Sequence, residues 1–308
     1  MITRAWQLWC RFWFEADGRR QTELFSRGLA LLLLVSALVR SIDLEFFFSQ
    51  QGMIRVESLP EVMNGEWRLT LFSVLTSKTA LWVCNAIYLA SLALLAFDWC
   101  ARLGRLPAVF ALVISISFIH RNPGAVYGVE LVSNFFLFYL CLIDRRPLAK
   151  RVIGDLRSTL GSVGFRLMQL QVCIIYGYSG MHKLKSPLWW KGEALWYVLG
   201  SQYARFDFSW LANWPGLVAV MSFGTIAWEI YFPALVWVPR VRPYVLIGGV
   251  LLHLGIALSI VIPFFSVLMM LTYLLFLDNA SLQNVESFFA HFSYRSQVPP
   301  PVSDRSYV

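Results

Sequence analysis

Hydrophobic residues fall in long blocks along the chain, and short polar connections separate them. A helix needs about 20 mostly apolar residues to cross a bilayer, so this pattern predicts membrane spans. We predict eight, at residues 24–46, 79–99, 106–120, 127–144, 160–182, 215–238, 244–262 and 264–278. The last two are separated only by a turn at Pro263, so they form a tight hairpin or one broken unit. The predicted fold is therefore all-α: a polytopic membrane bundle of about eight transmembrane helices.

Polar segments divide the chain into three parts. Residues 1–22 form a basic, aromatic leader that we expect to be an amphipathic helix, residues 23–278 form the transmembrane domain, and residues 279–308 form a polar, Pro-containing tail that we expect to be disordered. Two connections, 47–78 and 184–214, are longer than a turn requires and carry several Trp and Phe residues. Because indole rings prefer the membrane interface, we expect short amphipathic helices there.

The distribution of charge predicts the orientation in the membrane. Only 14% of the residues are charged and 58% are hydrophobic, against about a quarter charged in an average soluble domain. Successive connections lie on alternate sides of the membrane. Lys and Arg are denser in the connections on one side than in those on the other, and the denser side is the one that holds the leader and the tail. Cytoplasmic loops of membrane proteins are enriched in Lys and Arg, so we expect both termini to be cytoplasmic. The net charge of +8 is explained by this pattern and does not indicate a nucleic-acid partner.

The fifth span ends in a lysine on a polar helical face. Counting back from Lys183 by helical turns gives four residues on the same face, Ser179, Tyr176, Val172 and Gln169. A polar stripe in a span faces the bundle interior or a wet cavity, whereas a terminal lysine on its own commonly extends to the interface. A lysine in an apolar pocket is able to act as a base near neutral pH. Candidate neighbours are His182, Trp189 and Trp190, which follow on the chain.

A second group of polar residues lies where the third span ends. His120, Arg121 and Asn122 come directly before Pro123, which stops the helix. One interpretation is structural, with Arg121 and Asn122 donating hydrogen bonds to the last carbonyls of the helix. The other is a site for a carboxylate or a developing oxyanion, built from an imidazole, a guanidinium and an amide. Both interpretations fit the sequence.

Glu229 and His253 lie in the middle of the sixth and seventh spans. A buried carboxylate takes up a proton or pairs with a cation, and the two residues are expected at similar depth on consecutive helices. We expect them to hydrogen-bond to each other, either as a packing contact between helices or as a proton relay that contacts a quinone. The chain has only four histidines, which are widely spaced, and no metal-binding motif, so no metal site is predicted.

Six motifs in this chain occur in the same order as in one known family. They are Arg11-Phe12-Trp13-Phe14, His120-Arg121-Asn122-Pro123, the segment from Tyr176 to Leu184, Trp190-Lys191-Gly192-Glu193-Ala194, Trp228-Glu229 with Phe232-Pro233, and His253-Leu254-Gly255-Ile256-Ala257 followed by Phe264. The pattern resembles the HTTM (horizontally transferred transmembrane) domain family, which is related to the membrane domain of vitamin K-dependent gamma-glutamyl carboxylase. The resemblance covers roughly residues 8–278.

The resemblance implies an activity. In the carboxylase, a lysine deprotonates reduced vitamin K, which reacts with oxygen to give an epoxide and a strong base. That base removes a proton from glutamate, and the carbanion takes up carbon dioxide. Lys183 falls at the position of the catalytic lysine. The animal enzyme has a second lysine where this chain has His182, and a large lumenal region that docks its substrates, where this chain has two modest loops.

These observations favour a quinol-dependent enzyme of the bacterial inner membrane. The expected catalytic residues are Lys183, His120, Glu229 and His253. The expected cofactor-binding residues are Tyr176, Ser179, Gln169, Trp189 and Trp190, and those expected to bind the substrate or an oxyanion are Arg121, Asn122 and His182. The cofactor is reduced vitamin K or menaquinol, with oxygen and carbon dioxide as co-substrates and the bilayer as partner. The alternative is a non-redox factor that assists maturation or export of a small secreted peptide toxin.

Overall fold

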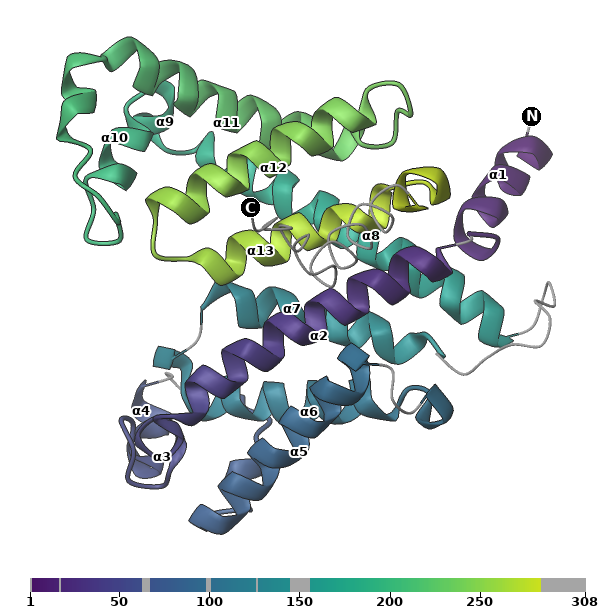
Figure 1. Ribbon diagram of the computed structural model, residues 1–308, viewed down its shortest axis with the longest axis vertical. Helices are drawn as coiled ribbons and strands as arrows, with labels where there is room; N and C mark the ends of the chain where they lie inside the picture. Colours follow the sequence, from purple (N-terminus) through teal and green to yellow (C-terminus); the bar gives the residue numbers. More distant parts are fainter. Residues whose placement is uncertain are drawn as a thin grey trace, which may run out of the picture.

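All regular elements in the described part of the chain are helical, as the sequence predicts (Figure 1). The computed structural model describes residues 2–16, 18–62, 67–97, 101–125, 127–144 and 156–283. Within these ranges the only extended pairing is an isolated antiparallel bridge between Ala204 and Ile260. The all-α class is thus confirmed.

The α-helices fall into long helices of the bundle and short helices of the connections. They are α1 (Ile2–Phe14), α2 (Arg19–Ser41), α3 (Leu44–Phe48), α4 (Leu59–Val62), α5 (Lys78–Phe97), α6 (Leu106–Arg121), α7 (Gly128–Leu142), α8 (Leu156–Lys183), α9 (Pro187–Trp190), α10 (Ala194–Leu199), α11 (Pro215–Leu235), α12 (Arg242–Ser259) and α13 (Pro263–Thr272). Six 3₁₀ turns complete the described chain: η1 (Val56–Ser58), η2 (Leu71–Ser73), η3 (Ala101–Leu103), η4 (Pro123–Ala125), η5 (Ser209–Asn213) and η6 (Tyr273–Phe276).

The long helices run back and forth between two ends of the molecule (Figure 1). One group of helices packs in chain order, each against the next: α2, α5, α6 and α7. In a second group α8 packs most extensively against α11, α11 packs against α12, and α12 packs against α13. α13 and η6 return to α2, so the two groups share one apolar core. The short helices α3, α4, α9 and α10 lie together with the α12–α13 connection at one end, on the left in Figure 1. We call this the loop end.

Among the described residues, four helices are long and apolar enough to cross a membrane: α2, α5, α11 and α12. The apolar helices α6, α7 and the segment Pro263–Phe276 are shorter. α8 has 28 residues but is more polar. The chain therefore has the features of a membrane protein, whereas the eight spans of the sequence analysis remain a prediction.

Some boundaries differ from those predicted. The first predicted span, 24–46, is interrupted, because α2 ends at Ser41 and α3 begins at Leu44. The start of the predicted tail is helical over residues 279–283, where Leu282 is buried. The Gln21 amide donates to the Asn279 side chain and so ties this segment to α2. Residues 284–308 lie outside the described part of the chain.

Candidate functional site

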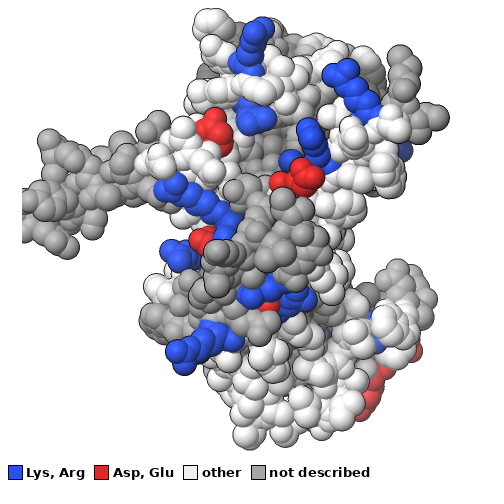
Figure 2. All heavy atoms as spheres, turned by 90° about the vertical axis from the view of Figure 1, so that its right-hand side faces the viewer, with Lys and Arg blue, Asp and Glu red and all other residues white. Residues whose placement is uncertain are grey.

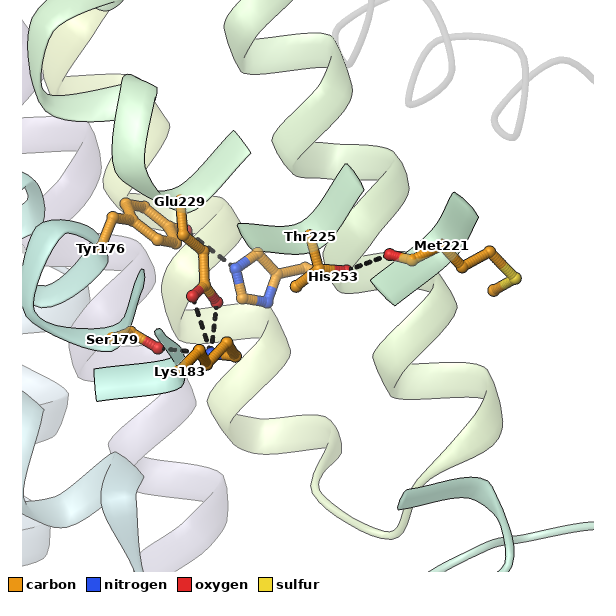
Figure 3. A network of polar contacts seen from close by, with 7 residues as sticks. All are labelled: Tyr176, Ser179, Lys183, Met221, Thr225, Glu229 and His253. Carbon is orange, nitrogen blue, oxygen red and sulfur yellow. Dashed lines mark hydrogen bonds and ion pairs between the residues drawn. The ribbon is translucent and has the colours of Figure 1, made fainter. Parts of the chain in front are cut away.

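Lys183 and Glu229 form a closely bonded ion pair between α8 and α11 (Figure 3). The Lys183 ammonium lies 2.8 Å from Glu229 Oε1 and 2.7 Å from Oε2, and it also donates to Ser179 Oγ at 2.7 Å. The exposed fraction of the side chain is 20% for Lys183 and 10% for Glu229. The Lys183 side chain thus points into the protein, as the polar stripe predicts, and does not extend away from the helix bundle.

Two glycines of α8 bring α11 close enough for this contact. A Cβ atom added to Gly180 would lie 2.8 Å from Ile230 Cγ1 and 3.2 Å from Glu229 Cβ, and one added to Gly177 would lie 3.4 Å from Pro233. Any side chain at position 180 would therefore push the helices apart. The small residues before Lys183 place the Glu229 backbone next to this helix.

Tyr176 connects the same face of α8 to α12 and η6. Its hydroxyl lies 2.8 Å from His253 Nε2 and 2.7 Å from the Tyr273 hydroxyl. All three side chains are buried, and the other ring nitrogen, His253 Nδ1, is buried with no hydrogen-bond partner. Figure 3 draws His253 bonded to Tyr176 and Glu229 bonded to Lys183. The site thus contains an ion pair, a phenol pair and one imidazole nitrogen with unused hydrogen-bonding capacity.

Aromatic rings surround these polar groups. The Tyr176 ring packs against Trp228 and Phe232, with centroids 4.8 Å and 4.4 Å away. On the loop end, the Lys183 ammonium lies 5.3 Å from the centre of the Trp189 ring, a cation–π contact. The polar groups of the site are thus enclosed by aromatic side chains.

The remaining members of the stripe lie farther down α8, and the structure separates them from the ion pair. Gln169 donates to the Leu275 carbonyl and accepts a hydrogen bond from Arg166, which also donates to the Phe12 carbonyl of α1. Gln169 is buried and inward-facing, as predicted, but its contacts join helices and do not reach Lys183. Val172 between them is completely buried.

Two predicted neighbours of Lys183 do not contact its side chain. Trp190 is 62% exposed, and its indole N–H donates to the Leu184 carbonyl. His182 is exposed and packs beside the exposed ring of Tyr178. Because consecutive helical residues point in different directions, His182 faces away from the ion pair formed by Lys183.

His120, Arg121 and Asn122 hold the connection between α2 and α5. The Arg121 guanidinium donates to the carbonyls of Ser49 and Ile54, and the Asn122 amide donates to the Phe47 carbonyl. His120 Nδ1 accepts a hydrogen bond from the Leu69 backbone at 2.8 Å.

Arg121 and Asn122 are fully buried, so their donors are directed at backbone carbonyls of this connection. They do not cap the last carbonyls of their own helix, which was the structural interpretation of the sequence. Among the described residues, no hydrogen bond or ion pair joins this group to Lys183.

Glu229 and His253 each bond to another partner, contrary to the expected direct hydrogen bond. The carboxylate bonds to Lys183, and the imidazole bonds to Tyr176. Tyr273 was missed by the sequence analysis, because it lies in an apolar segment with no polar neighbour to mark it. Gly249 gives an indirect signal, since a Cβ there would overlap the Tyr273 hydroxyl.

No group of three or more His, Cys, Asp or Glu side chains comes together over the described ranges in a way that would hold a metal ion. In comparisons with known proteins, the chain matches no family model, no curated protein and no solved structure.

Proposed function

We propose that this chain is an integral membrane enzyme in which Lys183 and Glu229 together take up a proton from the hydroxyl group of a reduced quinone. The observation that supports it most is the two-oxygen contact between Lys183 and Glu229, at the end of a helix and beside buried Tyr176 and His253. An ionisable pair in a membrane domain is costly and therefore suggests function. The HTTM-like motifs are the second support.

The ion pair changes the role expected of the lysine. A charged ammonium is no base, so Lys183 must first lose a proton, and Glu229 is the bonded acceptor. Transfer of this proton along the 2.7 Å contact leaves an amine and a carboxylic acid. A low dielectric disfavours the charged forms, so the free energy of the ion pair comes closer to that of this neutral pair. The amine then takes the substrate proton. The pair then holds one proton more than before, and Glu229 releases this proton to complete the cycle.

The residues around the pair suit a hydroxylated aromatic ring. His253 Nδ1 is a buried nitrogen without a partner, so a hydroxyl group there would fill an unused hydrogen bond. Trp189 and Trp228, which contact Lys183 and Tyr176, would place apolar rings beside such a ligand. When bound, reduced vitamin K or menaquinol would supply the acidic hydroxyl and the reactivity toward oxygen, with carbon dioxide as a further reactant if the resemblance extends to carboxylation.

The bacterial inner membrane remains the proposed location, with both termini in the cytoplasm. Figure 2 views the molecule from the end opposite the loop end, and Lys and Arg side chains gather on this face alongside fewer Asp and Glu side chains. A basic face at this end agrees with the positive-inside rule. The loop end, with Lys183, would then face the periplasm.

The alternative is a non-redox factor for maturing or exporting a secreted peptide. One observation favours it: the Lys183 ammonium and both Glu229 oxygens are already bonded within the protein. Such a pair is also what a packing contact between two membrane helices would look like. Activity must therefore decide between the two.

The test is quinol epoxidation by the purified protein in nanodiscs, with reduced vitamin K or menaquinol and oxygen. Wild type is compared with Lys183→Met and with Lys185→Met, an exposed lysine two residues away that serves as control. We expect epoxide from wild type and Lys185→Met and none from Lys183→Met. No epoxide from any protein, while the quinol stays reduced, would reject the proposal and favour peptide maturation.

A further inference from the structure

Arg40 lies in an aromatic cage near the end of α2. Its guanidinium carbon is 4.3 Å from the ring centre of Phe118, 5.3 Å from that of Tyr88 and 5.7 Å from that of Phe48. These rings come from α3, α5 and α6, so four helices meet at this arginine. The sequence analysis did not single it out.

One edge of this guanidinium has no partner. Nε and Nη2 are both buried and make no hydrogen bond. In an arginine, the N–H groups of Nε and Nη2 point in the same direction and form the fork that binds both oxygens of a carboxylate. The unused atoms of Arg40 are therefore the two members of one bidentate binding edge.

No acidic residue in the described chain occupies this edge. Glu130 is the acidic group that interacts electrostatically with Arg40, but the two form no ion pair, and the Glu130 carboxylate accepts from the Tyr127 backbone. The charge of Arg40 is therefore met by ring faces, by a polar interaction with the Tyr88 side chain and by the field of Glu130, without an ion pair.

The neighbouring helix has unused hydrogen-bonding capacity too. Asn85 is three residues before Tyr88 on α5, on the same helical face. Its amide donates to Ser41 Oγ, next to Arg40, while its carbonyl oxygen is buried without a partner. A buried polar atom without a partner is costly. Because this oxygen only accepts hydrogen bonds, a hydroxyl or amide group of a ligand would satisfy it, whereas a carboxylate would bond to Arg40.

We propose that Arg40 is the centre of a second binding site, for a ligand with a carboxylate or similar planar oxyanion. The two oxygens would accept from Nε and Nη2, while Phe118 and Tyr88 hold the guanidinium plane in place. The site is on α2, α5 and α6, away from the α8–α11 contact, and it does not depend on the proposed function. A water-borne molecule and a fatty acid carry the same carboxylate chemistry, and the two arms of the experiment below distinguish them.

Arg166 provides a matched control within the chain. Its guanidinium also stacks on a ring, 4.4 Å from that of Phe12, but its Nε and Nη1 atoms bond to the Phe12 carbonyl and to Gln169. Arg166→Lys therefore removes a stacked arginine whose Nε and Nη1 donors are bonded within the protein. Arg40→Lys keeps the charge but removes the free fork.

The experiment measures the melting temperature of the full chain in phosphatidylcholine nanodiscs. Sodium acetate is compared with sodium chloride at equal ionic strength, and oleate with oleyl alcohol, so that the two arms separate a water-borne from a membrane-borne carboxylate. A ligand that binds the folded state raises its stability. We expect a carboxylate-specific rise in at least one arm for wild type and Arg166→Lys, and about tenfold weaker affinity for Arg40→Lys, as for a lost charge-assisted hydrogen bond.

The proposal is overturned if neither carboxylate exceeds its control in wild type, or if Arg40→Lys responds as wild type does. If Arg40→Lys does not fold, the wild-type protein provides a second measurement, the ¹⁵Nε resonances of its arginines. Binding at the fork moves a buried Nε resonance as carboxylate is added. No such movement at saturating acetate and oleate also overturns the proposal.

Discussion

Gly180 lies directly against the backbone that carries Glu229: a Cβ atom at position 180 would be 3.2 Å from Glu229 Cβ and 3.1 Å from the Ile230 nitrogen. Backbone atoms cannot move away as a flexible side chain does. The separation of α8 and α11, and with it the Lys183–Glu229 contact, is therefore set by a glycine one helical turn before the lysine.

The first prediction concerns this glycine. Gly180→Ala should push α11 away, weaken the ion pair and lower stability by about 1–3 kcal/mol, as overpacking does. Gly161→Ala is the control, because the same added methyl group meets nothing within 4 Å, and alanine in a helix should stabilise by about 0.5–1 kcal/mol. Thermal unfolding in nanodiscs measures both. Equal changes in stability at the two positions would show that the close approach of α8 and α11 at Gly180 does not matter for stability.

The second prediction is a double-mutant cycle across the ion pair. Lys183→Met or Glu229→Gln alone should each destabilise the protein, by up to about 3 kcal/mol, because a largely buried group loses its partner. The double variant should cost clearly less than the sum, since no unpaired charge remains. Additive effects would indicate that the two side chains do not interact in the folded protein.

The polar face of α8 was predictable from helical spacing alone. Val172, Tyr176 and Gln169 are buried and Ser179 bonds to Lys183, because residues at these intervals share a face whatever the surrounding fold. The partner of Lys183 was not predictable. The sequence gives the depth of Glu229 in its helix but not the rotation of that helix, and the expected bond to His253 was wrong for this reason.

Arg40 shows another limit of the sequence. It is one charged residue in an apolar block, and its ring partners Tyr88 and Phe118 come from helices far along the chain. No periodicity links them. The same holds for Arg121, whose acceptors at Ser49 and Ile54 are irregular backbone that helical patterns do not describe.

The third prediction compares the two buried tyrosines. Tyr176→Phe removes the hydroxyl that bonds to both His253 and Tyr273 and leaves two buried polar groups unpaired, at about 1–3 kcal/mol each. Tyr273→Phe removes one bond, and Tyr176 keeps its bond to His253. Tyr176→Phe should therefore lower the melting temperature more. The reverse order would contradict Tyr176 as the bridging residue.

The fourth prediction decides what Arg121 does. Its guanidinium donates to the Ser49 and Ile54 carbonyls, which a lysine, with a single ammonium group, is not able to reach in the same geometry. Arg121→Lys should therefore loosen this connection and speed trypsin cleavage after the exposed Arg55, as followed by mass spectrometry.

Arg205→Lys is the control for this cleavage. Arg205 lies in the other long connection and donates to the Ile260 carbonyl after α12, so this variant should leave cutting at Arg55 unchanged. If Arg121 instead served an oxyanion, Arg121→Lys would reduce quinol turnover while cleavage stayed slow. Fast cleavage at Arg55 with unchanged quinol turnover would identify Arg121 as a residue that anchors the connection. Because both Nη atoms of Arg121 already bond to the backbone of this connection, we expect the second result.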